Sequence, residues 1–151
     1  NYNLLYGINF TVLRYSTAYG ERSRGVDVIS IFAKNALKHS DIIINGNGKQ
    51  TRNFIHVKDI AKGSVLALSN RYKNKTLNIG SYKKTKIIDL AKKIIKLSKS
   101  KSKLVIKKNK KRIDDFDLNK IPNKSLKNLL RFKMHYNLDK GIKRYLESLK
   151  N

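Results

Sequence analysis

The stretch GNGKQTRNFIHVKDIA, residues 46–61, passes from a turn to a strand and then to a helix. Its two glycines, each preceded by an asparagine in the chain, indicate tight turns. Residues 53–57 have the apolar character of a strand, and apolar side chains at helical spacing begin near Lys58. Arg52 comes immediately before this strand. Because lysine supplies most of the 35 basic residues of the chain, an arginine at this place requires an explanation.

The same kinds of pattern extend over the rest of the chain and predict an α/β fold. Strands and helices alternate as far as Gly80, which is typical of this class. The glycine turn predicts a hairpin between the strands that flank it. FTVLRY is expected to be a buried strand, and Thr85 and Asn137 are expected to cap helices. Strands are predicted over residues 10–15, 41–45, 53–57, 76–80 and 103–107, and helices over residues 26–38, 58–68, 85–97, 125–130 and 137–149.

The charge of the chain suggests nucleic-acid binding, but the pattern of the basic residues does not favour it. The formal net charge is +25, and residues 92–112 hold many basic residues and no acidic one. This run contains no aromatic side chain on which a base could stack. We therefore interpret it as a solvated surface. The A/T-rich codons of lysine, asparagine and isoleucine account for much of the excess charge.

Several classes of protein and site are disfavoured by composition. The chain has no cysteine, so neither a disulfide framework nor a cysteine metal site is expected. Its three histidines do not have metal-ligand spacing, and no metal site is predicted. The apolar runs are far too short for a membrane span, and the start of the chain does not resemble a signal peptide. A cytoplasmic location is the default prediction.

Five motifs in order resemble the C-terminal half of NAD-dependent sugar-nucleotide epimerases and dehydratases, in the extended short-chain dehydrogenase/reductase family. They are YGINFTVLRYSTAYGERSRG (6–25), INGNGKQTRNFIHVKDIAKG (44–63), LNIGS (77–81), RIDD (112–115) and LLRFKMHYNLDKGIKRYL (129–146). The resemblance covers nearly the whole chain. It implies an incomplete Rossmann-type domain, with the last strands only, and a small α/β substrate-binding lobe. Residues 1–151 would then be the C-terminal substrate-binding portion, and the N-terminal NAD-binding half would be absent.

The resemblance also implies roles for single residues. Arg52 corresponds to an arginine that contacts the diphosphate of the nucleotide sugar, and a guanidinium has the planar, paired donors that suit phosphate oxygens. The other implied sites are a second diphosphate-binding arginine, a ribose-binding carboxylate, a substrate-binding position where the family has asparagine, and backbone beside the nicotinamide ring. These correspond to Arg112, Asp115, Thr17 and the pair Tyr15 and Ser16, respectively.

Simpler interpretations stand beside these roles. Arg52 could brace the predicted hairpin, Arg112 could be a solvated member of the basic run, and Asp115 could only balance local charge. Tyr15 could pack in the core, with Ser16 ending the strand. The chain also departs from the family pattern: Glu21 replaces a proline, Asn53 an aspartate and Arg131 a glycine.

The sequence lacks the family's catalytic motifs. It contains no G-x-x-G-x-x-G turn for NAD and no Tyr-x-x-x-Lys pair for proton transfer, so no catalytic residue is predicted. We expect the chain alone to be inactive, with NAD bound mainly by the missing half and a homodimer possible only in the full-length enzyme. The expected partner is a nucleotide sugar. The other hypotheses are a basic nucleic-acid-binding module and a non-catalytic remnant of the family.

Overall fold

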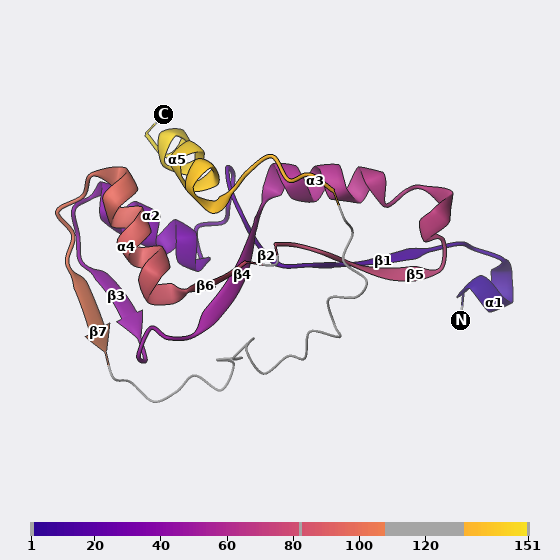
Figure 1. Cartoon of the computed structure of the whole chain (residues 1–151), viewed down its shortest axis with the longest axis horizontal. Coiled ribbons are helices and arrows are strands. Elements are labelled where there is room, and N and C mark those ends of the chain that lie inside the picture. Colours follow the sequence, from indigo (N-terminus) through magenta and orange to yellow (C-terminus); the bar gives the residue numbers. More distant parts are fainter. Residues whose placement is uncertain (1, 82, 108–131, 151) are drawn as a thin grey trace.

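The computed structural model describes residues 2–81, 83–107 and 132–150 of the chain. The molecule is elongated, with two groups of elements at its two ends (Figure 1). Within the described residues, no helix is both long and apolar enough to cross a membrane. One end carries the helices α2 (Val28–Leu37), α4 (Ile87–Ser98) and α5 (Leu138–Ser148). The other carries α1 (Tyr2–Tyr6), α3 (Val57–Leu66), the 3-10 turn Asn70–Tyr72 and the strands β1 (Thr11–Tyr15) and β5 (Lys75–Ile79).

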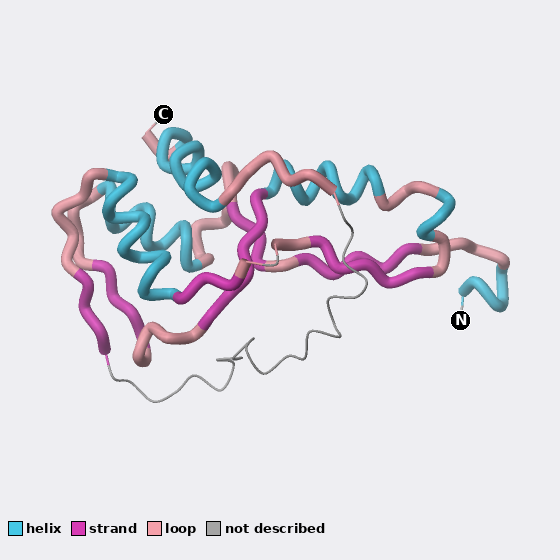
Figure 2. The backbone as a smooth tube through the Cα atoms, viewed as in Figure 1, coloured by secondary structure: helices cyan, strands magenta, loops and turns pink. Residues whose placement is uncertain are grey.

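Strands β1 and β5 form a parallel pair with α3 along it (Figure 2). Both strands were predicted, but the expectation that the first is buried is wrong. Val12 is 42% exposed and Tyr15 is 48% exposed. The cause is the small number of neighbours: among the described residues, β1 pairs only with β5, and one cluster of Ile55, Ala67, Leu77 and Ile79 packs against Leu13. An apolar run predicts a strand well, yet burial also depends on what covers that strand.

A second sheet has the order β2-β4-β6 and joins the two ends of the molecule. Its strands are β2 (Thr17–Tyr19), β4 (Thr51–His56) and β6 (Lys84–Lys86). The strand β4 is central: β2 pairs with it in parallel, with Thr17 opposite Phe54, and β6 pairs antiparallel, with Arg52 opposite Thr85. Neither β2 nor β6 was predicted, because each is only three residues long and shows no alternating pattern.

The predicted cap at Thr85 is wrong because that residue belongs to β6. The helix α4 begins at Ile87 after Lys86, which makes no side-chain cap hydrogen bond. The backbone N–H groups of Ile87 and Ile88 instead donate to the carbonyls of Gln50 and Gly48, at 3.0 and 3.1 Å. Carbonyls of the glycine turn at residues 46–50 thus accept from the first backbone N–H groups of α4, which the Thr85 side chain was expected to cap.

The predicted hairpin is also wrong, although its turn is present. Gly46 and Gly48 have φ angles of 81° and 68°, which favour glycine. The strand before the turn, β3 (Ile42–Asn45), pairs in parallel with β7 (Leu104–Lys107), whereas β4 lies in the other sheet. The turn therefore carries the chain from one sheet to another, and the predicted strand over 103–107 is confirmed as the partner of β3.

The three helices α2, α4 and α5 enclose the main core. Asp27, expected inside the first turn of its helix, is the N-cap and accepts from the backbone of Ser30. Asn137 caps α5 as predicted. Each fully buried large apolar side chain contributes roughly 1.5–3 kcal/mol of transfer free energy. The buried members of this core include Tyr19, Ile29, Phe32, Ile42, Ile44, Phe54, Leu90, Ile94, Ile142, Tyr145 and Leu146.

The helix α5 approaches β2 closely at a glycine. A Cβ atom at Gly141 would lie 2.0 Å from the hydroxyl oxygen of Tyr19 and 2.8 Å from its ring carbon Cζ. Both residues are buried, and the tyrosine ring packs in the main core, so moving it aside disturbs that packing. The glycine of the segment LDKGI is therefore required by the packing of helix on strand.

We predict that Gly141→Ala destabilises the protein although alanine is the better helix former. The helix preference would gain about 1 kcal/mol, but overpacking typically costs about 1–3 kcal/mol. Urea unfolding should show a net loss for Gly141→Ala, and a smaller loss when Tyr19→Phe is combined with it, because the nearest atom is then removed. An increase in the free energy of unfolding for Gly141→Ala would contradict the close approach.

Candidate functional site

The chain passes from the first sheet to the second at Ser16. The backbone N–H of Ser16 donates to the carbonyl of Ile79 in β5, at 2.9 Å. Gly80 makes this contact possible, because a Cβ atom there would lie 1.8 Å from the hydroxyl oxygen of Ser16. The carboxyl ends of two parallel strands therefore meet at this residue. In open α/β sheets, ligands bind outside the carboxyl ends of such strands.

Tyr15 does not pack in the core, so that interpretation is wrong for the described structure. Its ring is 48% exposed, and its hydroxyl oxygen lies 3.0 Å from that of Ser64 in α3. The Ser64 hydroxyl in turn donates to the carbonyl of Ile60. This short chain of hydrogen bonds fixes the ring over α3 and leaves one face of it accessible.

Thr17 and Arg52 lie on neighbouring strands of the second sheet. Thr17 begins β2 opposite Phe54, two residues along β4 from Arg52. Arg52 is half-buried and lies within the central strand, not before it. The strands β3 and β4 do not form the hairpin that Arg52 could have braced. The structure therefore brings together two residues that are far apart in the sequence and that the family resemblance assigned to one ligand.

The other two predicted substrate contacts, Arg112 and Asp115, lie outside the described residues. So do the predicted helix over residues 125–130 and the family departure at Arg131. The basic run 92–112 is described as far as Lys107, and most of its lysines in this part are exposed. Lys93 is different: it is half-buried and forms an ion pair with Asp139 of α5.

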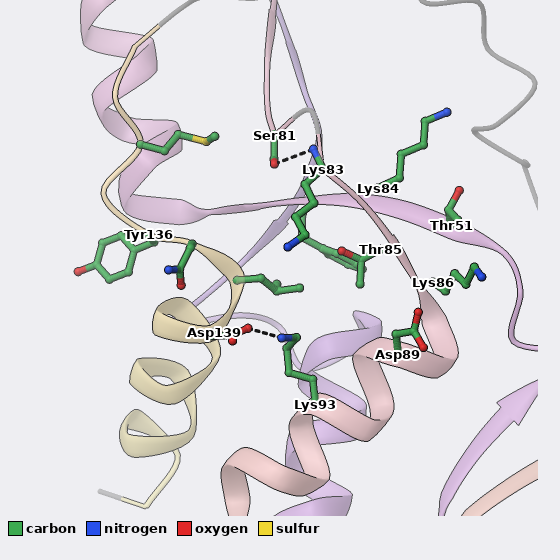
Figure 3. Close-up of a pocket in the computed structure, with 14 residues that line it drawn as sticks. Thr51, Ser81, Lys83, Lys84, Thr85, Lys86, Asp89, Lys93, Tyr136 and Asp139 are labelled. Atoms are coloured by element: carbon green, nitrogen blue, oxygen red, sulfur yellow. Dashed lines mark hydrogen bonds and ion pairs between the residues drawn. The ribbon is translucent and has the colours of Figure 1, made fainter.

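A cavity of about 810 Å³ lies between the second sheet and the N-terminal ends of α4 and α5 (Figure 3). Thr85, which pairs with Arg52, lines it, whereas Tyr15, Ser16, Thr17 and Arg52 do not. In Figure 3 the Lys93 ammonium points to Asp139 across the cavity. The charged side chains of the wall are predominantly cationic, which favours an anionic ligand. They are Lys83, Lys84, Lys86 and Lys93, against Asp89 and Asp139.

One polar group in the wall of this cavity is unsatisfied. Thr51 is 5% exposed, and its hydroxyl oxygen has no hydrogen-bond partner among the described residues. A buried hydroxyl without a partner costs free energy, so such a group is a candidate contact for a ligand or an ordered water. No group of three or more acidic, histidine or cysteine side chains in the described part of the chain could hold a metal ion.

The loop after β2 is tied to α5 by an ion pair that the sequence did not reveal. Arg144 of α5 donates through Nε to the carboxylate of Glu21. Burial alone would raise the pKa of Glu21, but its own backbone N–H and the Arg144 side chain outweigh burial and lower the pKa. Glu21 therefore remains ionised near neutral pH, in the position where the family has proline.

His56 lies behind Glu21 and is completely buried. Its Nδ1 accepts from the backbone N–H of Lys58 at 3.3 Å, so the neutral ring carries its proton on Nε2. That nitrogen lies 3.3 Å from a carboxylate oxygen of Glu21, but the two are not aligned as a hydrogen bond. Burial lowers the pKa of His56, and the opposing effects of Glu21 and Asp59 do not reverse this. The ring stacks on Tyr136, with centroids 4.0 Å apart.

Asp59, which was considered only as a helix start, closes the C-terminal segment onto α3. Its carboxylate is 1% exposed and accepts from the backbone N–H groups of His135 and Tyr136, at 2.8 and 2.9 Å. An aspartate in the first turn of a helix normally suggests only a favourable dipole interaction. Its partners lie 76 and 77 residues away, and no local pattern indicates them.

Comparison with known proteins supports the resemblance. The model of the NAD dependent epimerase/dehydratase family matches residues 1–80, which is more than half of the chain. The chain belongs to this family. The family resemblance is thereby confirmed, and so is the α/β fold class: the parallel strands match the Rossmann-type structures of family members.

Two curated relatives in the family show how much of a whole protein the chain represents. It is 48% identical over 92 residues to a putative UDP-glucose 4-epimerase of Methanocaldococcus jannaschii, covering 59% of this chain and 30% of that protein. It is 30% identical over 151 residues to a UDP-N-acetyl-alpha-D-glucosaminuronate decarboxylase of Bacillus cytotoxicus, covering 95% of this chain and 47% of that protein. The chain thus spans less than half the length of these relatives.

Solved structures of family members agree with the fold. The UDP-glucose 4-epimerase of Thermotoga maritima, solved with UDP-glucose, matches with a TM-score of 0.84 and 26% identity. The match covers 99% of this chain and 48% of that one. The UDP-glucuronic acid 4-epimerase of Bacillus cereus, solved with UDP-glucuronic acid and NAD, matches with a TM-score of 0.77 and 25% identity, over 99% of this chain and 48% of that one.

We predict that the stability of the protein falls as the pH is lowered through the range in which histidine titrates. Because the pKa of His56 is lowered in the folded state, the unfolded chain binds a proton first, near pH 6.5. This contribution to stability is complete above about pH 7 and is lost as the pH falls below the unfolded-state pKa of about 6.5, with a slope of at most about 1.4 kcal/mol per pH unit.

Urea unfolding between pH 5 and pH 8 measures this effect. His56→Asn should flatten the dependence in that range, whereas His135→Gln, at an exposed histidine, should retain it. An equal slope for wild type and His56→Asn would show that the buried ring does not govern the acid sensitivity.

Proposed function

We propose that residues 1–151 act as the substrate-binding portion of an NAD-dependent nucleotide-sugar epimerase or dehydratase, and that they bind the diphosphate of the nucleotide sugar. The observation that carries this proposal is the position of Arg52 and Thr17 on adjacent strands, beside a cavity with a lysine-rich wall. Relatives named as epimerases and a decarboxylase act on UDP-sugars.

The backbone of Arg52 is suited to holding a phosphate-binding side chain. It lies in the central strand of its sheet, opposite Thr85 of β6, and the same strand pairs with β2 from Phe54 onward, so the ladder on each side restrains β4. A guanidinium presents paired donors to phosphate oxygens and is not deprotonated near neutral pH. The lysines of the neighbouring cavity wall add a positive field that attracts a diphosphate.

The remaining contacts extend the same assignment along the ligand. Thr17, half-buried at the start of β2, offers a hydroxyl that both donates and accepts, where the family has an asparagine amide. Arg112 and Asp115 are proposed from the family resemblance alone, as a second diphosphate contact and a ribose contact.

The described residues fit one side of an NAD site. The carboxyl ends of β1 and β5 meet at Ser16, where the absence of a side chain at Gly80 makes room for the Ser16 hydroxyl. Tyr15 and Ser16 would form the wall beside the nicotinamide ring. NAD would supply reversible hydride transfer at this place, and the residues of this chain would orient the nucleotide end of the sugar. A cytoplasmic location and a homodimer of the full-length enzyme stay predictions.

We predict that Arg52→Ala weakens binding of UDP-glucose or dTDP-glucose to the chain by about tenfold to a hundredfold. A hydrogen bond to a charged group contributes roughly 1.5–3 kcal/mol, and about 1.4 kcal/mol corresponds to a factor of ten. Arg52→Lys keeps the charge but loses the paired donors, so it should also weaken binding. Titration calorimetry with each nucleotide sugar, and with uridine and glucose alone, measures the effect.

The loss should be confined to ligands that carry the diphosphate. Arg71→Ala, at an exposed arginine at the other end of the molecule, is the matched control and should bind as the wild type does. Thermal melting of each variant is measured in parallel. A sharp drop in the melting temperature of Arg52→Ala, with normal binding by the folded fraction, would instead make Arg52 a structural residue.

A further inference from the structure

The loop after β2 contains one residue, Arg22, whose side chain disfavours its backbone conformation. Residues 20–25 connect β2 to the cap of α2, and three of them have positive φ: Gly20 (141°), Arg22 (61°) and Gly25 (80°). For a residue with a side chain, such as Arg22, this left-handed conformation is unfavourable and persists only where surrounding contacts impose it. The loop therefore depends on interactions with other elements.

Two side chains make those interactions: Ser23 is bonded to Asp27 and Ser30 at the start of α2, and Glu21 reaches elements farther away. One carboxylate oxygen accepts from Arg144 of α5, and the other lies 3.3 Å from Nε2 of the buried His56 in β4. The side chain of Glu21 is 22% exposed, so solvent weakens this pairing less than it weakens a fully exposed ion pair. Within the loop, the backbone N–H of Gly25 donates to the hydroxyl of Ser23, at 3.2 Å.

The two partners of Glu21 are themselves held in place. His56 accepts from the backbone of Lys58 and stacks on Tyr136, so its ring has a single orientation. Arg144 is on α5, whose buried side chains pack in the main core. Glu21 thus bonds the loop to the core helix α5 and lies against a buried ring of the central strand, and its partner Arg144 lies 123 residues away in the chain.

The position of Glu21 explains why a charged residue replaces the proline of the family pattern. A proline fixes φ near −65° and restrains such a loop without any partner. Glutamate gives no local restraint, but its carboxylate restrains the loop through contacts. The loop also walls a cavity of about 360 Å³, which Ala18, Arg22, Arg24 and Val57 line as well and which lies next to the strand that carries Thr17.

We propose that Glu21 is a positioning residue: it fixes the loop after Thr17 through its ion pair with Arg144, against the buried ring of His56, and so presents a preformed wall to the nucleotide sugar. The part of this statement that concerns the ligand rests on the proposed function. The part that concerns the loop rests only on the contacts described above. The two parts can be tested separately on the same variants.

Hydrogen exchange of the full chain tests the loop. Glu21→Ala and Arg144→Ala should each speed exchange of the Ser23 and Gly25 amides by about tenfold or more, because the local opening becomes easier. The amides of α4 should not change. Glu147→Ala, at an exposed glutamate of the same helix as Arg144, is the matched control and should leave the loop amides unchanged. Unchanged loop exchange in Glu21→Ala would overturn the proposal.

Restoring the family residue separates positioning from charge. Glu21→Pro removes the ion pair but restrains the backbone, so it should return the Gly25 amide to slow exchange. Calorimetry with UDP-glucose should show about a threefold to tenfold loss of affinity for Glu21→Ala and recovery to within about twofold of wild type for Glu21→Pro. Proline that slows exchange without restoring affinity would show that the carboxylate itself, and not the loop geometry, matters.

The two proposals fail in different ways. If the wild-type chain binds no nucleotide sugar, the proposed function is wrong, and the exchange rates still decide whether Glu21 holds the loop. If the wild type binds UDP-glucose while Glu21→Ala retains both its affinity and its slow loop exchange, the proposed function stands and the positioning role is wrong.

Discussion

The two hydrogen bonds that the Asp59 carboxylate accepts from the backbone of His135 and Tyr136 hold the C-terminal segment on the fold. Asp59 is 1% exposed, and a buried carboxylate must be paired because desolvation of its charge is costly. Hydrogen bonds to a charged group contribute roughly 1.5–3 kcal/mol each. They fix Tyr136 next to the cap of α5, so one side chain of α3 restrains the start of that helix, whose buried side chains pack in the main core.

The position of α5 in turn determines what packs around the loop at residues 20–25. Tyr136 stacks on His56, and the ring of Tyr19 is perpendicular to the His56 ring, with the two centroids 5.3 Å apart. Burial, with Asp59 and Asp139 adding to it, raises the pKa of Tyr19, which therefore stays a neutral phenol inside this group. The same helix supplies Arg144 for Glu21. A structural carboxylate is thus connected through packed rings to a loop beside the proposed ligand site.

The sequence predicted local structure better than it predicted partners. Apolar periodicity located β1, β4, β5, β7 and the helices α2 to α5, because each of these patterns is contained in one continuous segment. It failed where the structure depends on which segments pair with each other. The strand β3 pairs with β7 instead of β4, and Thr85 belongs to β6 instead of capping a helix. The burial of β1 was overestimated because an apolar run does not show which neighbours are present to cover it.

In the candidate site, too, local features were predicted from the sequence and long-range contacts were not. Arg52 was singled out because it stands out among lysines and belongs to a local motif, and it lies two residues along β4 from Phe54, the partner of Thr17. Glu21 was noted only as a departure from the family proline. Its partners lie on another strand and on the last helix, and a contact across 123 residues has no signature in a single sequence. The motif identified the position, and only the fold identified its function.

The two ends of the molecule are packed unequally, and this bears on the proposed function. The main core beneath α2, α4 and α5 includes Phe54 of β4, two residues from Arg52. The β1–β5 sheet has a small apolar cluster and leaves Val12 and Tyr15 substantially exposed. The strand that carries Arg52, the proposed diphosphate contact, is therefore anchored in the better-packed part. Tyr15 and Ser16, proposed to face NAD, lie at the end of the less well packed sheet, so the proposed nucleotide-sugar contacts depend less on how that sheet is covered.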